Sequence, residues 1–337
     1  MVRDFAGRRR HTTNGSRLGV NIPPNSAAPL ATVVLLCFNY ERFIDEALDG
    51  LFAQTYRPLD IIILDDCSSD QSAKIIEARL AQRGNPPNIR FIRNQQNMVH
   101  PIPGILGMIK GDFVVLASAD DVMLPHMVER LVQTWMEQKV SLVTANAFYI
   151  DDASNFLNRT FRALGLPADD SFETLARDGS NACCFGAAMG FERAIYETFG
   201  WPPTEFLECS DIVLPFYAYL LGGACFIHEP LLKYRVHSRN SSLSLKGEKT
   251  TGEEQLLALD RSLRNHLAHA IFFDEELDRI RSKSPERYTA LANRIRPLVS
   301  TQITEMGRKL TRNRRELSQL RQPNRISSDE GEPSLGH

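Results

Sequence analysis

The fold of this chain is decided by the stretch GDFVVLASADDV, residues 111–122. It contains a five-residue apolar run, Phe113 to Ala117, whose β-branched and aromatic side chains are typical of a buried strand. The run ends abruptly in two adjacent carboxylates, Asp120 and Asp121. Burying carboxylates without partners costs several kcal/mol, so we expect this pair at an open strand end or facing a cation.

Two interpretations of the acidic pair remain open. In open α/β sheets, ligands bind beyond the carboxyl ends of the strands. Paired carboxylates there suit Mg²⁺ or Mn²⁺, which take oxygen ligands and are commonly shared with substrate phosphates. The alternative is a solvated loop between a strand and a helix, in which an aspartate caps the helix start.

Upstream of residue 111, strands and helices alternate. An Ile-rich run at 61–64 must be covered on both faces, as in a parallel sheet, and it too ends in a carboxylate pair, Asp65 and Asp66. Three strand-and-helix alternations predict a parallel α/β sheet. The expected elements are strands at 32–38, 61–64 and 89–92, amphipathic helices at 43–52 and around 75–80, and a weak helix near 105–109.

Downstream, the pattern loosens after a helix at 127–135 and a strand at 140–149. We expect a surface excursion at 151–170, short helices at 172–176 and 191–199, an apolar helix at 212–221, a strand at 224–228 and a polar loop at 234–238. Residues 251–322 are charged and periodic enough for two or three helices. The ends, 1–29 and 323–337, read as flexible segments.

Composition narrows the class of protein. The chain has 337 residues, 43% of them hydrophobic and 24% charged, which is ordinary for a globular protein. A net charge of −2 gives no support to nucleic-acid binding. Neither a dinucleotide G-x-G-x-x-G after the first strand nor a P-loop is present. The six cysteines lack C-x-x-C spacing, which favours reduced thiols in a reducing compartment. Arginines crowd both ends, either as solvated faces or as a surface for a membrane.

Five fragments in order give a more specific indication. They are VVLLCFNY (33–40), IILDDCSSD (62–70), KGDFVVLASADD (110–121), Ser210-Asp211 and YRVHS (234–238). Together they resemble the family-2 glycosyltransferases of the GT-A fold, over roughly residues 31–242. The resemblance implies an α/β fold with a Rossmann-like, mostly parallel central sheet flanked by helices, here with a C-terminal helical extension.

The resemblance also implies roles for single residues. Phe38, Asn39 and Tyr40 would line the pocket for the nucleotide base, and Asp65 would accept a hydrogen bond from the base. Asp120 would lie near the ribose and phosphates. Mn²⁺ or Mg²⁺ would be held by Asp121, with His237 approaching the metal or the diphosphate. Asp211 would be the general base, and the family inverts the anomeric centre.

Each of these residues also has an ordinary structural interpretation. Asp65 and Asp211 stand where acids begin helices, and a loop histidine such as His237 is often merely solvated. Tyr234 and Arg235 can simply pin their loop. The sequence departs from the family at Ser118, where an Asp is frequent, at Ser210, where Glu is common, and at residues 100–104. Glu208 is therefore a second candidate for the base or for the residue that orients it.

The predicted function is metal-dependent, inverting hexosyl transfer from a UDP- or dTDP-sugar to a glycan, lipid-linked or small-molecule acceptor, in polysaccharide biosynthesis. The alternative is an inactive sugar-nucleotide-binding or assembly subunit. The expected location is cytoplasmic, with the inner face of the membrane as an option, and the C-terminal helices are the candidate surface for peripheral membrane association or homo-oligomerisation. The predicted divisions are a basic leader (1–29), a nucleotide-sugar half (30–150), an acceptor half (151–245), a helical extension (246–322) and a tail (323–337).

Overall fold

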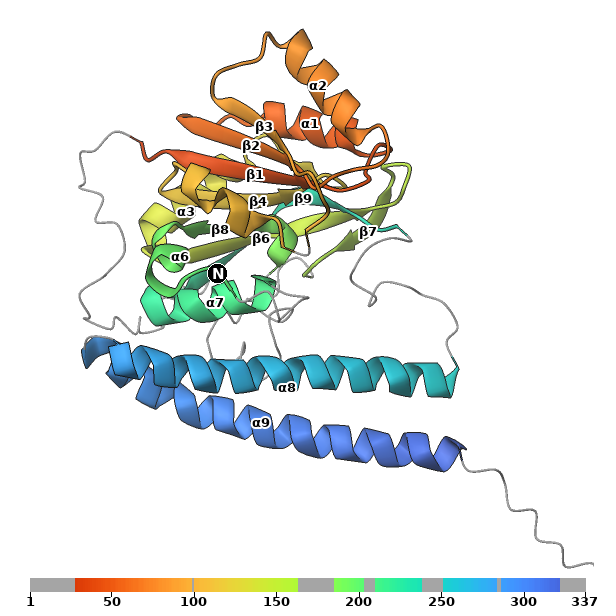
Figure 1. Ribbon diagram of the computed structural model, residues 1–337, viewed down its shortest axis with the longest axis vertical. Helices are drawn as coiled ribbons and strands as arrows, with labels where there is room; N and C mark the ends of the chain where they lie inside the picture. The colour runs from red at the N-terminus through yellow and green to blue at the C-terminus, as the bar shows by residue number, and fades with distance from the viewer. Residues whose placement is uncertain are drawn as a thin grey trace, which may run out of the picture.

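The computed structural model describes residues 28–98, 100–162, 185–202, 210–237, 251–283 and 286–321. Within these ranges one nine-stranded sheet forms the centre, and a long helical hairpin lies along one side of it (Figure 1). The predicted α/β fold with C-terminal helices is therefore confirmed. The division into nucleotide-sugar and acceptor halves stays a prediction.

The N-terminal half of the sheet has four parallel strands in the spatial order β3-β2-β1-β4. All of β2 and nearly all of β1 is buried, because helices cover both faces and the strands are continuous apolar runs. The elements are β1 (Ala31–Cys37), α1 (Ile44–Phe52), β2 (Leu59–Asp65), α2 (Ser72–Gln82), β3 (Ile89–Arg93), the 3₁₀ helix η1 (Ile102–Met108) and β4 (Phe113–Ser118).

Gly111, just before β4, lies where the chain passes very close to β1. A Cβ at this position would come within 2.8 Å of the Ala31 carbonyl carbon, which is backbone and cannot rotate away. The backbone N–H of Gly111 donates to Thr32 Oγ1 at 2.8 Å. The close approach of two segments of the chain, residues 111 and 31–32, therefore requires a glycine in front of β4.

The C-terminal half of the sheet mixes directions. β8 pairs antiparallel with both β4 and β6, β9 is parallel to β6, and β5 and β7 are antiparallel to β9 and β6. The elements are β5 (Val122–Met123), α3 (Met127–Gln138), β6 (Leu142–Ile150), β7 (Phe156–Thr160), the 3₁₀ helix η2 (Gly186–Ala188), β8 (Met189–Glu192), α6 (Ala194–Phe199), α7 (Ser210–Leu221) and β9 (Ala224–Arg235).

Local predictions differ from the structure in this half. Residues 234–235 end strand β9 instead of belonging to a polar loop, residues 156–160 form β7 within the predicted surface excursion, and residues 189–192 form a strand ahead of α6. In each case β6 supplies the pairing partner: it forms a hairpin with the neighbouring β7, and it pairs with β8 and the end of β9 from a distant part of the chain. Local periodicity does not record such pairing. The helix expected at 172–176 lies outside the described residues.

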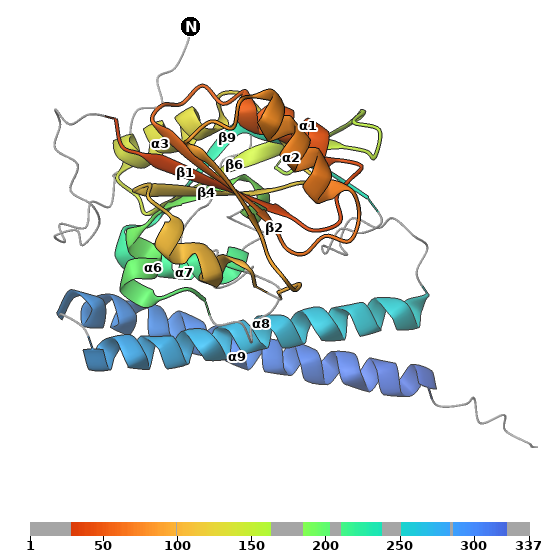
Figure 2. The ribbon, with the colours of Figure 1, turned by 45° about the horizontal axis from the view of Figure 1, so that its top comes forward.

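Two apolar cores lie on opposite faces of the sheet. Helices α1, α2 and α3 contribute to one, and α6 and α7 contribute to the other. Figure 2 shows α1 and α2 above the sheet and α6 and α7 below it. The sheet therefore separates α1, α2 and α3 from α7, the helix that carries Asp211.

The C-terminal helices form an antiparallel hairpin of α8 (Gly252–Lys283) and α9 (Glu286–Arg321). Its half near the turn joins the core with α7, through residues such as Phe273 and Ile295. Its far half has a small core of its own around Leu263, Met306 and Leu310. Within the described ranges, no helix combines the length and hydrophobicity that a bilayer crossing needs.

Candidate active site

The predicted donor residues gather at one edge of the sheet, where β1, β2 and β4 end. Cys37 pairs with Asp65 across the ladder, and Leu36 pairs with Ser118. The loops that follow the three strands therefore start side by side. This is the carboxyl edge of the parallel strands, where ligands bind in sheets of this kind.

Asp65 is completely buried at the end of β2, and only one of its carboxylate oxygens has a partner. Oδ2 accepts a hydrogen bond from the Ser68 backbone N–H at 3.2 Å and lies 3.2 Å from Arg93 Nε. Oδ1 is also buried and accepts no hydrogen bond from the described residues. An unpaired buried acceptor costs roughly 1–3 kcal/mol, so a donor group of a ligand would stabilise it.

The neighbouring Asp66 is fully engaged by the protein. Its carboxylate accepts hydrogen bonds from Asn94 Nδ2 at 2.7 Å, Asn97 Nδ2 at 3.0 Å and the Met98 backbone N–H at 3.0 and 3.1 Å. Charge-assisted hydrogen bonds of this kind are the strong ones. Asp66 therefore holds the segment after β3 against the end of β2.

The loop after β1 is tied to the loop after β2. The Asn39 backbone N–H donates to Ser68 Oγ at 2.9 Å, and Asn39 Oδ1 accepts from the Ser69 N–H at 2.8 Å. Asn39 and Cys67 have φ angles of 57° and 64°, a strained backbone region that is frequent at functional sites. Asn39 thus builds the loop, while the Phe38 ring is 42% exposed and offers a free aromatic surface.

Three side chains converge on Asp120 at the end of β4. His237 Nε2 lies 3.0 Å from Asp120 Oδ2, and the hydroxyl groups of Ser118 and Tyr40 are hydrogen-bonded to the same carboxylate. The His237 ring packs against Phe43, with 5.1 Å between the ring centroids. His237 was predicted to share a metal with Asp121. In the structure it contacts the neighbouring carboxylate, Asp120.

The two carboxyl groups of this pair have opposite pKa shifts. Burial alone would raise the pKa of Asp120, but hydrogen bonds from His237 and Ser118 outweigh it and hold that pKa below its ordinary value. Burial and the adjacent charge of Asp120 raise the pKa of Asp121 well above its ordinary value, against the opposing effect of the Arg235 N–H. Asp121 is thus a buried carboxyl group for which the charge and N–H of Arg235 offset only part of the cost of burial.

Arg235 organises this corner, although we expected it only to pin its loop. Its side chain is 1% exposed. The backbone N–H donates to Asp121 Oδ1 at 2.9 Å, Nε donates to the Asp120 carbonyl at 2.9 Å, and Nη2 donates to Glu46 Oε2 at 2.5 Å. The local sequence carries no signal for this burial, because Lys233, Tyr234 and His237 make the surroundings of Arg235 polar. A buried arginine needs several acceptors, and here they come from distant segments. Two further acceptors, Asp151 O and Ser154 Oγ, lie 3.0 and 2.9 Å from Nη1.

The candidates for the general base lie in a different part of the chain. Asp211 belongs to the first turn of α7, although the structure does not describe its side chain, and Glu208 lies outside the described residues. The structure therefore gathers the predicted donor residues at one edge and leaves the contacts of Asp211 and Glu208 undescribed.

The edge of the sheet that holds Asp65, Asp120 and Asp121, which we call the donor edge after the predicted role of these residues, fits a divalent cation. Asp121 Oδ1 accepts one hydrogen bond, and Oδ2 accepts none from the described residues. An oxygen-rich pair with an only partly compensated carboxyl group suits Mg²⁺ or Mn²⁺, which are commonly bound by one or two carboxylates together with substrate phosphates. In the part of the chain that the structure describes, no cluster of three or more Asp, Glu, His or Cys side chains has metal-binding geometry. Substrate oxygens would have to complete the coordination.

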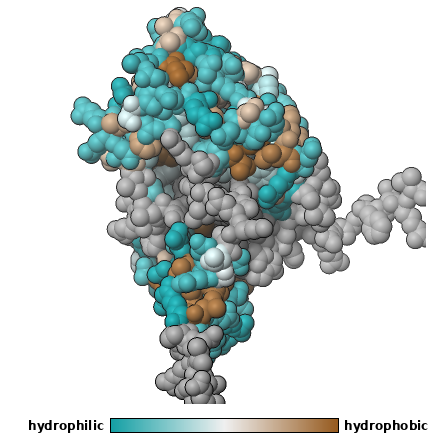
Figure 3. Space-filling model, turned by 90° about the vertical axis from the view of Figure 1, so that its right-hand side faces the viewer, coloured by the Kyte–Doolittle hydropathy of each residue, from teal (hydrophilic) through white to brown (hydrophobic). Residues whose placement is uncertain are grey.

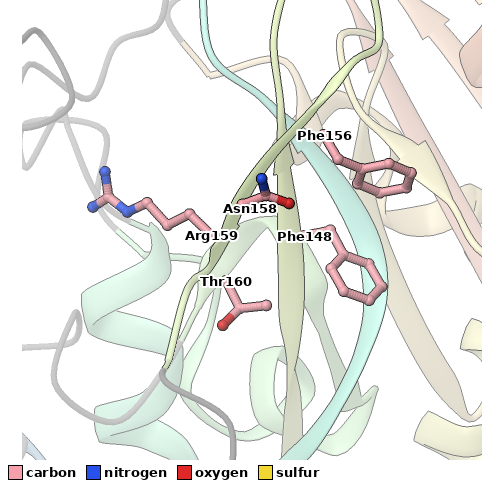
Figure 4. A pocket seen from close by; sticks show the side chains of 5 residues that line it. All are labelled: Phe148, Phe156, Asn158, Arg159 and Thr160. Carbon is pink, nitrogen blue, oxygen red and sulfur yellow. The ribbon is translucent and has the colours of Figure 1, made fainter.

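A cavity of about 540 Å³ lies away from this edge, on the β6–β7 hairpin. Figure 4 shows the rings of Phe148 and Phe156 on one side of the hairpin and the Arg159 side chain pointing to the other. Phe156 is 55% exposed. The face seen in Figure 3 is mostly hydrophilic, with separate hydrophobic areas. No residue of the acidic pairs lines this cavity, so it is distinct from the donor edge.

Two solved structures with bound nucleotides have the same fold. TarS 1-349 of S. aureus, in complex with UDP, has a TM-score of 0.50 at 16% identity, over 85% of this chain and 91% of that chain. The mannosyltransferase PcManGT from Pyrobaculum calidifontis, in complex with GDP-Man and Mn²⁺, has a TM-score of 0.51 at 15% identity, over 92% of each chain. The predicted GT-A fold is thereby confirmed.

Relatives in sequence agree. An uncharacterized glycosyltransferase of Nostoc sp. is 26% identical over 217 residues, 63% of this chain and 66% of the relative. Glycosyltransferase GlyG of Streptococcus pneumoniae is 26% identical over 124 residues, 37% of this chain and 41% of the relative. The matches thus span less than two thirds of these relatives' lengths. The family model described as "Glycosyl transferase family 2" matches residues 32–200, half of the chain. The chain belongs to glycosyl transferase family 2.

Proposed function

We propose that the chain is a metal-dependent, inverting hexosyltransferase that uses a uridine or thymidine diphosphate sugar. The observation that carries the choice of nucleotide is the single unpaired oxygen of Asp65. Uracil and thymine present one N–H donor, N3–H, on their pairing edge, which matches one free acceptor. Guanine presents two adjacent donors and would need both carboxylate oxygens, one of which Ser68 and Arg93 already engage.

The donor edge then receives the rest of the nucleotide sugar. The exposed Phe38 ring offers a stacking surface for the base, and the loop built by Asn39 and Tyr40 borders it. Asp120 lies toward the ribose and phosphates, held by His237 and Tyr40. Asp121 and His237 are the residues that would hold Mn²⁺ or Mg²⁺. When bound, the cation would stabilise the negative charge of the departing diphosphate by several kcal/mol.

The transfer step needs a base on the other side of the sugar. The acceptor hydroxyl oxygen forms a bond to the anomeric carbon while the bond from that carbon to the diphosphate oxygen breaks. The proton of the hydroxyl passes to the Asp211 carboxylate, and the electron pair of the broken bond leaves with the nucleoside diphosphate. Attack opposite to the leaving group inverts the anomeric centre. A positioned carboxylate base contributes typically about 10²–10⁴ in rate; Glu208 is the alternative base or orients Asp211.

The experiment is a transfer assay with a panel of UDP-, dTDP- and GDP-sugars and Mn²⁺, with glycan, lipid-linked and small-molecule acceptors. We expect turnover with a UDP- or dTDP-sugar, a product of inverted configuration by NMR, and loss of turnover in Asp211→Asn with unchanged UDP affinity. Loss in Glu208→Gln instead would identify Glu208 as the base. UDP binding without turnover by any combination would favour the non-catalytic subunit.

We propose a role in polysaccharide biosynthesis at the cytoplasmic face of the membrane. The support consists of the thiols of Cys37 and Cys67, which form no disulfide, and of exposed arginines on the far half of α9, such as Arg308, Arg312 and Arg315. Basic side chains near anionic lipid contribute about 1 kcal/mol each. Flotation with anionic vesicles at physiological salt tests this location, and sedimentation of the free protein tests homo-oligomerisation through α8 and α9.

A further inference from the structure

Helix α7, which carries Asp211, is interrupted by a proline. Pro215 lies inside Ser210–Leu221 and has no N–H to donate to the carbonyl of Asp211, four residues earlier. A proline at such a position weakens or kinks the helix. The first turn, residues 210–214, is therefore less firmly fixed by its own helix than residues 216–221, which we call the body of α7.

The body of α7 is held by a polar contact with the hairpin. Tyr217 is 1% exposed, and its hydroxyl donates to Glu276 Oε2 of α8 at 3.1 Å. Arg279 donates to both oxygens of Glu276, at 2.8 and 2.5 Å, and to the Phe199 carbonyl at 3.1 Å. One carboxylate of the hairpin thus connects α7, α8 and the end of α6.

Stacked aromatic rings reinforce this contact. Phe216 stacks on Phe273 of α8, with centroids 4.1 Å apart and planes 11° apart. Tyr217 stacks on Phe199, with centroids 4.7 Å apart and planes 13° apart. Aromatic pairs add about 0.5–1.5 kcal/mol beyond the area that they bury. The body of α7 is therefore fixed on two sides by polar and aromatic contacts, whereas the first turn, beyond the proline, is held by the apolar packing of Ile212, Val213 and Leu214.

We propose that the helical hairpin positions the acceptor-side carboxylate of the active site, with Glu276 as the positioning residue that acts through Tyr217 and the body of α7. This inference rests on the proposed function of Asp211. The hairpin fixes the part of α7 behind Pro215, and the first turn presents Asp211 from that fixed point. Rates of oriented reactions are sensitive to displacements of about 1 Å, so loosening the body of α7 changes turnover more than it changes nucleotide binding.

A purely stabilising role has a matched control within the same hairpin. Asp260 of α8 is 6% exposed and Glu276 is 8% exposed. Each pairs with arginine: Asp260 contacts Arg264 at 2.8 Å and Arg314 at 3.1 Å. These contacts lie within the hairpin, in its far half. If the hairpin only stabilises the fold, Asp260→Asn and Glu276→Gln have equal effects on turnover at equal losses of stability.

The experiment compares Glu276→Gln, Tyr217→Phe and Asp260→Asn in the full chain with the parent. Four quantities are measured: Tm, UDP affinity with Mn²⁺ by calorimetry, kcat and KM for transfer, and amide hydrogen exchange over residues 210–216. In Glu276→Gln we expect kcat to fall about tenfold, UDP affinity to stay within twofold, and exchange over 210–216 to rise. Asp260→Asn is expected to lower Tm without these changes. Tyr217→Phe removes a single hydroxyl and keeps the comparison usable if Glu276→Gln does not fold.

Two results would overturn the inference: unchanged exchange over 210–216 in both Glu276→Gln and Tyr217→Phe, or a loss of kcat in Asp260→Asn equal to that in Glu276→Gln. Failure of the proposed function is a different result, namely no turnover by the parent protein. In that case the exchange measurement still decides whether Glu276 fixes α7.

Discussion

The ends of β2 and β4 each carry two adjacent aspartates, and the protein treats the members of each pair differently. At the end of β2, Asp66 is saturated by Asn94, Asn97 and Met98, whereas one oxygen of Asp65 has no hydrogen-bond partner among the residues that the structure describes. At the end of β4, Asp120 is engaged by Ser118, Tyr40 and His237, whereas Asp121 has one hydrogen bond, from the Arg235 backbone.

This difference between the two aspartates of each pair shows how one acidic edge can contribute to both stability and binding. A carboxylate that receives several hydrogen bonds fixes loops, and a carboxylate with a free oxygen is costly unless a ligand supplies the missing donor or charge. Asp66 and Asp120 therefore hold the edge together. Asp65 is left to bind the nucleotide base, and Asp121 is left to bind the cation.

The largest expected effect is that of Asp121→Ala on turnover. We expect kcat for transfer to fall about 10³-fold, because stabilisation of the leaving group by a bound cation is worth several kcal/mol. Turnover with saturating Mn²⁺ is the measurement. Asp152→Ala is the matched control, since the Asp152 side chain forms an exposed ion pair with Arg42 and the substitution keeps the backbone carbonyl that faces Arg235. Full activity of Asp121→Ala would show that its free oxygen is not a ligand position.

Asp65→Asn should weaken UDP binding about 10- to 100-fold, because a mismatched buried polar group costs about 1–3 kcal/mol. The amide oxygen can still accept from Ser68 and Arg93, so we expect little loss of stability. Calorimetric titration with UDP is the measurement. GDP is the control ligand: if GDP binds the parent protein as tightly as UDP does, the role of the single free oxygen is wrong.

Asp66→Asn should lower stability and leave UDP binding nearly unchanged, the opposite of Asp65→Asn. Removing the charge from a carboxylate that accepts hydrogen bonds from three residues should lower the free energy of unfolding by about 1–3 kcal/mol. UDP affinity of the folded protein should stay within about twofold. Chemical denaturation and UDP titration measure the two quantities. Equal losses of UDP affinity in the Asp65 and Asp66 variants would abolish the distinction between them.

The smallest effect concerns stability and pH. A carboxyl whose pKa is raised by folding opposes folding once the pH exceeds its ordinary value, 3.8 for Asp121, because the folded state holds the proton more tightly. With a chelator present, Asp121→Asn should therefore melt above the parent protein at pH 7, by a margin that shrinks toward pH 4. Thermal melts across this range provide the measurement, and a margin independent of pH would contradict the shift.

Much of the N-terminal half of the sheet, β1 to β4, could be predicted from the sequence. The apolar runs at 61–64 and 113–117 became β2 and β4 because a strand buried on both faces has no polar positions. The carboxyl-edge position of Asp65, Asp120 and Asp121 followed from the parallel order. The C-terminal half of the sheet was harder, since β8 pairs with β4 and β6, and the end of β9 pairs with β6, from distant parts of the chain, while β7 pairs with the neighbouring β6.

The sequence by itself determined the alternating sheet, the family resemblance and the residues that border its edge, because periodicity and motif spacing are local properties. Only the tertiary structure decided which aspartate of each pair is saturated. Asn94 and Met98 reach Asp66 from the end of β3, and His237 reaches Asp120 across 117 residues of chain. Hydrogen bonds of this kind depend on which loops the sheet places side by side. The neighbouring residues in the sequence therefore do not reveal that Asp65 and Asp121 are the members with a free oxygen.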